Sequence, residues 1–194
     1  RRIVYNEATI IQPLGPAMDQ QALPSCVGKA FQGRLGALLG VDVSGVGLWI
    51  ECRAYDGKLN DPTVGTRAEN AIEILLDNGY LTRLTQDEDS IADTDPRLVQ
   101  MPSLQDMLAA DDQRLQKAID HHTIVGSDNE KHAAILDALR ATDAEGKPCY
   151  AVVFGTGVNE AYMSPPANTV LDETYLSPFG RLGGHEQGIV GWSR

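Results

Sequence analysis

The sequence predicts an α+β protein whose N-terminal half is mainly helical and whose C-terminal end is rich in strands. Apolar residues recur at helical spacing through the first 80 residues, whereas continuous apolar runs with β-branched residues lie mostly toward the C-terminus. Glycine and proline mark the loops between these segments. Helices first and strands last are typical of two packed lobes rather than of alternating β-α-β units.

Length and composition indicate one globular domain. The chain has 194 residues, of which 42% are hydrophobic and 22% are charged, so it can bury a sizeable core. We expect a single domain over residues 1–194, with a mainly helical lobe (1–84), a mainly antiparallel β lobe (85–194) and a cleft between them. No apolar run is long enough to span a bilayer, and no signal peptide opens the chain.

The acidic composition argues against binding to nucleic acid. The net charge is −11 at pH 7 and no basic cluster interrupts it, so a phosphate backbone would be repelled. Solubility is the ordinary explanation of such a charge. The chain begins with Arg1 rather than methionine, so we interpret it as a processed product or a fragment of unknown compartment.

Three helices are predicted in the first lobe. Residues 1–24 form an extended lead-in with a short strand at 3–5, because glycine and proline interrupt the later part of this segment. Helices follow over 25–39, 46–55 and 66–77, each with apolar side chains at helical spacing.

The second lobe is predicted to combine helices with late strands. Residues 82–100 are polar and indicate a surface loop, and a short helix is expected to start at Ser103. The ambiguous segment 115–125 ends in β-branched residues that favour a strand at 121–125. The remaining predicted elements are a helix (128–141), a strand buried on both faces (149–154), a loop-rich stretch (155–177) and a strand entered through two glycines (183–192).

Neither the acidic loop nor the histidines indicate a metal site. The acidic residues of the loop lack the glycine and the distal glutamate of a calcium loop. His121 and His122 would point to opposite faces of a strand, and with His132 and Cys149 they show no zinc ligand-pair spacing. We interpret them as surface or structural residues and predict no metal and no cofactor.

The three cysteines are expected to have different roles. Their odd number argues against a dense disulfide framework. Cys52 and Cys149 are expected to be buried thiols or, as the alternative, to form one bridge. In either case Cys26 stays free.

Cys26 lies where the first helix is predicted to begin. The loop from Asp19 breaks at Pro24, and Ser25 is expected to cap the helix. Unpaired N–H groups and the positive end of the helix dipole favour a thiolate at such a position. A buried structural cysteine is the alternative, and for Cys26 taken alone it is the favoured one.

Two further residues make this cysteine a candidate nucleophile. Gln20, six residues upstream, supplies an amide donor in the same loop, and His185 enters a late strand behind Gly183 and Gly184. Cysteine catalysis needs a thiolate, a base for its proton and donors for the oxyanion. Cys26, His185 and Gln20, together with the N–H of Cys26, meet these needs if the late strand packs against the helix.

The chain resembles the papain-like cysteine peptidases, most closely their compact microbial members. Four segments carry the resemblance in the family's order: the nucleophile loop (Gln20 to Cys26), the third helix (65–80), a strand with its following turn (146–162) and the segment of the base (184–192). The resemblance covers residues 15–194 and implies a helical N-terminal lobe packed on an antiparallel β lobe. It also implies that Gly65 and Gly184 contact the substrate.

The chain departs from the family's pattern at three places. Just before the nucleophile the family has a cysteine and a glycine, where this chain has Leu23, Pro24 and Ser25. Just after the nucleophile the family has an aromatic residue, where this chain has Val27. Glu186 follows the histidine in place of a small apolar residue, and a close carboxylate would raise the pKa of the base. The family's orienting asparagine is absent before Arg194, so it lies beyond the chain, another residue replaces it, or the domain is catalytically impaired.

The lead hypothesis implied by the resemblance is hydrolysis of a peptide or protein substrate through Cys26 and His185, although the same fold also supports amide and acyl transfer. The alternative is a catalytically impaired papain-like module that serves as a structural or binding part of a larger assembly, such as a phage particle. Neither hypothesis involves nucleic acid or a membrane. Secretion and association with a virion are both compatible with them.

Thiol labelling tests the assignment of the nucleophile. Iodoacetamide or an epoxide reagent is expected to label Cys26 ahead of Cys52 and Cys149 in the folded protein, because an activated thiolate reacts faster than a protonated thiol. Mass spectrometry of the digested protein gives the three rates. Equal labelling of all three cysteines would contradict the activated thiol.

Overall fold

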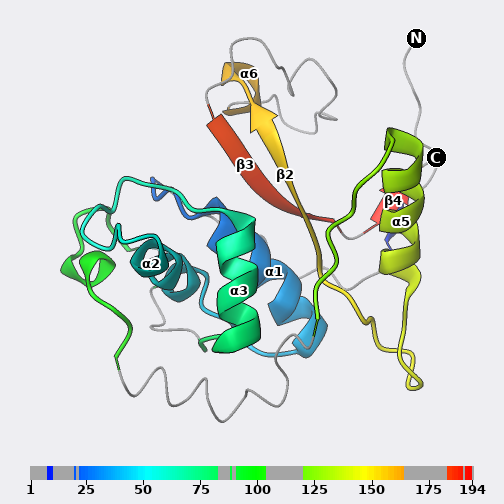
Figure 1. Cartoon of the computed structure of the whole chain (residues 1–194), viewed down its shortest axis with the longest axis horizontal. Helices are drawn as coiled ribbons and strands as arrows, with labels where there is room; N and C mark the ends of the chain where they lie inside the picture. Colours follow the sequence, from blue (N-terminus) through cyan, green and yellow to red (C-terminus); the bar gives the residue numbers. More distant parts are fainter. Residues whose placement is uncertain are drawn as a thin grey trace.

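Three helices pack side by side in the first part of the fold (Figure 1): α1 (Cys26–Leu39), α2 (Gly45–Tyr55) and α3 (Ala68–Asp77). The computed structural model describes residues 8–10, 20, 22–82, 88, 91–103, 120–163, 183–189 and 191–193. All three predicted helices are confirmed, with α3 beginning at Ala68 rather than at residue 66.

Local sequence explains where these helices begin and end. The Ser44 hydroxyl accepts a hydrogen bond of 2.8 Å from the N–H of Gly47 and so caps α2. Helix α1 ends at Gly40, whose φ of 68° lies in the left-handed region that glycine adopts without strain. Helix α3 buries one apolar stripe, formed by Ala71, Ile74 and Leu75.

A pair of glycines brings α1 and α2 into backbone contact. A Cβ atom on Gly28 would overlap with the carbonyl oxygen of Gly45, and a Cβ on Gly45 would lie 2.9 Å from the carbonyl oxygen of Gly28. No side chain fits between the two helices at this point. Because Cys26 is the first residue of α1, this crossing sets where the helix start lies relative to α2.

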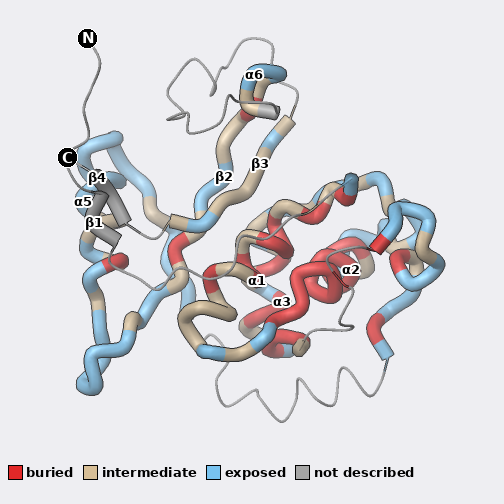
Figure 2. Tube along the Cα trace, turned by 180° about the vertical axis from the view of Figure 1, so that it is seen from behind, coloured by how far each residue is buried: buried red, intermediate tan, exposed pale blue. Residues whose placement is uncertain are grey.

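The helices supply most of the core (Figure 2). One cluster of buried side chains joins all three of them around Phe31, Leu48 and Leu75. A second cluster surrounds Trp49 and extends to Leu98 of the short 3-10 helix η2 (Pro96–Val99). The predicted surface loop over 82–100 therefore contributes to the core, which corrects the prediction.

Glu88 shows why the polar composition of that loop was misleading. Its side chain is buried, with 1% of the residue exposed, and its carboxylate accepts a hydrogen bond of 2.9 Å from the N–H of Val46 in the first turn of α2. The ammonium of Lys29 lies 3.9 Å from the same carboxylate oxygen. A buried carboxylate is stable at a helix start with a cation beside it, whereas the sequence alone suggested exposure.

Strands β2 (Val152–Val158) and β3 (Gly183–Ile189) form a two-stranded antiparallel sheet. The register pairs Thr156 with His185. Strand β3 packs along α1, and the β2–β3 ribbon separates the three helices from α5 (Asp128–Arg140) (Figure 1). The predicted helix over 128–141 is thereby confirmed.

Three predictions about the strands are wrong in detail. Strand β2 begins at Val152 rather than at 149 and continues through 155–158, where a loop was expected. It is not buried on both faces, since Phe154 is 36% exposed. In the described part of the sheet β2 pairs with β3, and the burial of β2 is interrupted in its middle, at Phe154 and Gly155. Residues 121–125 form no strand, because β-branched content without a pairing partner is not sufficient.

A second antiparallel pair lies beside α5 (Figure 1) and joins β1 (Ala8–Ile10) to β4 (Gly191–Ser193). The predicted strand over 183–192 therefore divides into β3 and β4, which have different partners. The predicted strand at 3–5 and the body of the helix expected from Ser103 lie outside the described residues.

All three cysteines are free thiols. Cys52 is buried as predicted, and burial raises its pKa to about 12. Cys149 is exposed, so the expectation that it is buried or bridged to Cys52 is wrong. Within the described residues, no helix is both long and apolar enough to cross a membrane.

The glycine crossing can be tested with a single methyl group. Gly28→Ala is expected to lower the free energy of unfolding by about 1–3 kcal/mol, because the added Cβ must push α1 away from α2. Urea denaturation followed by circular dichroism measures the loss. Gly183→Ala is the matched control, because a Cβ there meets no atom within 4 Å. Equal stability of the two variants would contradict the proposed backbone contact.

Candidate active site

Cys26 is the first residue of α1 and is half-buried against the helical core. Ser25 occupies the N-cap position, but its side chain makes no capping hydrogen bond, which corrects the prediction. Its hydroxyl is buried and has no partner among the described residues. The start of α1 thus lacks the side-chain cap that α2 has, and its first-turn N–H groups are not occupied by Ser25.

Gln20 closes a turn just before Cys26. Its amide donates a hydrogen bond of 3.2 Å to the carbonyl oxygen of Leu23, and the N–H of Leu23 donates one of 3.1 Å to the carbonyl oxygen of Gln20. A primary amide has two N–H donors, so this contact uses one of them and leaves one. The two hydrogen bonds of this turn hold Gln20 in the loop that leads to Cys26.

Gly65 borders the same loop. A Cβ on Gly65 would lie 3.5 Å from the carbonyl oxygen of Pro24. The indole N–H of Trp49 donates a hydrogen bond of 3.0 Å to the carbonyl oxygen of Val64, which anchors this segment to the core. Gly65 is exposed, so its backbone is accessible beside the nucleophile loop.

His185 lies on β3. The strand packs along α1, and the side chain of Arg34 in α1 lies directly against Gly188 of β3. Gly184 precedes His185 at an exposed position and pairs with Gly157 in the ribbon. The condition set by the sequence is therefore met, since the strand with the histidine packs against the helix with the cysteine.

The environment of His185 differs from the prediction. Burial lowers its pKa below the ordinary value of histidine, whereas a nearby Glu186 was expected to raise it. Successive side chains of a strand point to opposite faces, so Glu186 leaves the face that His185 occupies. The ring of Tyr162 lies against His185 instead, with the ring centroids 5.4 Å apart.

Tyr162 lies against His185 and within electrostatic range of Cys26. Burial raises its pKa, a hydrogen bond with the side chain of Gln187 partly offsets this, and negative charge at Cys26 raises it further. Among the described residues, no hydrogen bond joins Cys26 directly to His185. Such bonds are often long in unliganded enzymes and tighten when the substrate binds.

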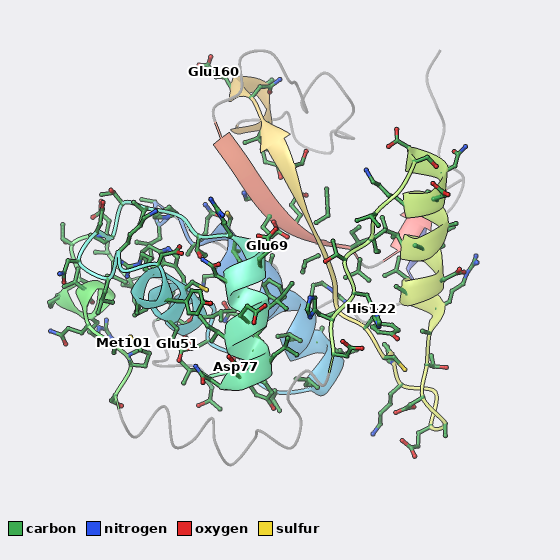
Figure 3. The ribbon with its side chains drawn as sticks, in the orientation of Figure 1. Glu51, Glu69, Asp77, Met101, His122 and Glu160 are labelled. Atoms are coloured by element: carbon green, nitrogen blue, oxygen red, sulfur yellow. The ribbon has the colours of Figure 1, made fainter. Side chains whose placement is uncertain are left out.

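Glu186 lies on the opposite face of β3, within electrostatic range of Glu69 in α3. Burial and the charge of Glu69 both raise the pKa of Glu186. Glu69 lies at the end of α3 nearest to the ribbon (Figure 3). Gly155, which pairs with Glu186, makes room for its carboxylate, because a Cβ on Gly155 would lie 2.9 Å from a carboxylate oxygen.

The sequence did not identify Tyr162 and Gln187 as residues of the site. Tyr162 lies in the turn after β2, and the signal for its position is Asn159, a residue that favours helix starts. Gln187 could have been identified from strand alternation, which places it on the same face of β3 as His185. In the described part of the chain, no group of three or more potential ligands could hold a metal ion.

Comparison with solved structures reveals a similarity to xylellain, a cysteine protease from Xylella fastidiosa. The TM-score is 0.65 with 19% sequence identity, and the match covers 97% of this chain and 70% of xylellain. No protein-family model matches the sequence, and no curated protein matches it. The mixed arrangement of helices with a small antiparallel sheet is thus similar in fold to a cysteine protease.

The raised pKa of Glu186 predicts a pH-dependent effect on stability. A carboxyl group whose pKa is higher in the folded state destabilises the fold once it ionises, so Glu186→Gln is expected to raise the urea midpoint at about pH 7.5. At about pH 4, where the carboxyl group is mostly protonated in both states, the gain should largely disappear.

Glu160→Gln is the matched control, since Glu160 is exposed on the short helix α6 (Glu160–Met163) (Figure 3). It should leave the midpoint unchanged at both pH values. A gain from Glu186→Gln that is equal at both pH values would contradict the burial of a charged carboxylate.

Proposed function

We propose that this chain is a papain-like cysteine peptidase that hydrolyses peptide bonds through Cys26 and His185. The observation that supports it is the packing of β3, with His185, along the helix that begins with Cys26, in a fold similar to a cysteine protease. In this proposal, Cys26 at the start of α1 is the nucleophile and His185 on β3 is its base.

In the proposed mechanism, the sulfur of Cys26 attacks the carbonyl carbon of the scissile peptide while His185 holds its proton. The C–N bond breaks as the imidazolium of His185 donates this proton to the leaving amine, and an acyl thioester forms on Cys26. A water molecule then attacks the thioester. His185 accepts its proton and returns it to the sulfur, which releases the carboxylic acid and restores the thiol.

The donors for the oxyanion come from the loop and the helix start. The second N–H of the Gln20 amide and the backbone N–H of Cys26 are the proposed pair, since Gln20 uses its other N–H within the turn. Gly65, beside Pro24, offers its backbone to an extended peptide by partial strand addition. Gly184, exposed ahead of His185, is the proposed contact on the opposite side.

Turnover assays with four variants test this proposal. Cys26→Ala is expected to abolish cleavage of a fluorogenic peptide library, and His185→Ala should lower kcat by at least about a thousandfold, since nucleophile and base act as a unit. Gln20→Ala should lower kcat by about a hundredfold, the usual effect of removing one oxyanion donor. Cys149→Ala, which alters an exposed thiol, is the control and should retain full activity.

Turnover and thiol labelling of the wild type test the alternative of a non-catalytic module. A module that only binds a partner would show no turnover in the wild type. Its Cys26 would react with iodoacetamide no faster than the exposed Cys149. Either result would overturn the peptidase assignment.

A further inference from the structure

Tyr162 is fixed by the turn that follows β2. Its N–H lies 3.2 Å from both the carbonyl oxygen and the side-chain oxygen of Asn159, the residue before α6. Two acceptors on one donor hold the backbone of the short helix against the end of the strand. The chain therefore folds back directly after Val158, and Tyr162 returns over the ribbon.

The side chain of Tyr162 is held by two residues of β3. Its ring contacts the imidazole of His185 with a centroid distance of 5.4 Å and an angle of 59° between the planes, which is a favourable aromatic geometry. Its hydroxyl group bonds with the side chain of Gln187. His185 and Gln187 lie on one face of β3, so one tyrosine spans both of them.

The nucleophile is within electrostatic reach of the same hydroxyl group. Negative charge at Cys26 is one of the causes that raise the pKa of Tyr162. The helix α6 and the strand β3 thus meet at this side chain, and the start of α1 lies within range of its charge.

We propose that Tyr162 is a positioning residue that holds the imidazole of His185 in place for proton exchange with Cys26. This inference rests on the proposed peptidase function and adds a component to it. The ring restricts the rotation of the imidazole and excludes water from one of its faces, while the bond to Gln187 holds the ring. Tyr162 thereby restrains His185 from the short helix α6, which follows β2 directly.

A histidine titration tests this role without any turnover. In a Cys26→Ala background, which removes the thiolate, His185 is followed by NMR with labelled histidine. Tyr162→Ala is expected to shift the pKa of His185 upward toward the ordinary value, because the imidazole gains contact with water. Tyr162→Phe, which keeps the ring, should leave it close to that of the background. The exposed His121, His122 and His132 are internal controls.

Kinetics supply the second readout, in the chain that retains Cys26. Tyr162→Ala should lower kcat and the alkylation rate of Cys26 by about tenfold or more with KM little changed, because the base is misplaced and the peptide is not. Tyr162→Phe should restore kcat to within about threefold of the wild type. Where Tyr162→Ala does not fold, Tyr162→Leu removes the same ring with less loss of volume.

Tyr150 provides a matched control. Its ring contacts His122 edge-on at 5.9 Å, so it is a second tyrosine–histidine pair, but it is exposed and lies away from the site. Tyr150→Ala should leave kcat and the titration of His185 unchanged. The proposal is overturned if Tyr162→Ala leaves both the titration and kcat within experimental error of the parent. It is also overturned if Tyr162→Phe is as impaired as Tyr162→Ala.

The outcomes separate this inference from the proposed function. A wild type without turnover would refute the peptidase, yet the titration would still report whether Tyr162 controls the imidazole. A peptidase whose kcat is insensitive to Tyr162→Ala would keep its function and lose the positioning residue.

Discussion

The packing of α1 against two different partners is the constraint on which the rest of the structure depends. On one side Gly28 meets Gly45 of α2 at backbone distance, and on the other Arg34 lies against Gly188 of β3. Glycine at three of these four positions allows the elements to approach more closely than side chains would permit. The start of α1, and with it Cys26, is thereby located relative to both the helical core and the strand that carries His185.

Buried charge supports the same arrangement. Lys29 of α1 and Glu88 are both almost fully buried, and Glu88 also accepts a hydrogen bond from the first turn of α2. Such a group costs free energy to desolvate, and it is tolerated because a cation and a helix N-terminus both face it. The loop that contains Glu88 is therefore tied to the same two helices that cross at Gly28.

The sequence predicted the three helices well because their apolar spacing is strong and local. It named the packing of the late strand against the helix with Cys26 only as a condition, and β3 does pack along α1. It failed where structure depends on partners distant in sequence. The exposure of β2 depends on which elements cover its faces, the burial of Glu88 depends on Lys29, and the contact of Tyr162 with His185 depends on a turn at Asn159. None of these is visible in a local pattern.

The register of the β2–β3 ribbon determines which side chains share each face of β3. His185 and Gln187 share the face that meets Tyr162, whereas Glu186 lies on the other face, within reach of the charge of Glu69. A slip of one residue would exchange the two faces and bring a carboxylate to the position of the imidazole. Continuous pairing over both strands, from Val152 with Ile189 to Val158 with Gly183, holds this register. The ribbon thus does more than complete the fold, because its pairing decides that His185 rather than Glu186 lies on the face that meets Tyr162.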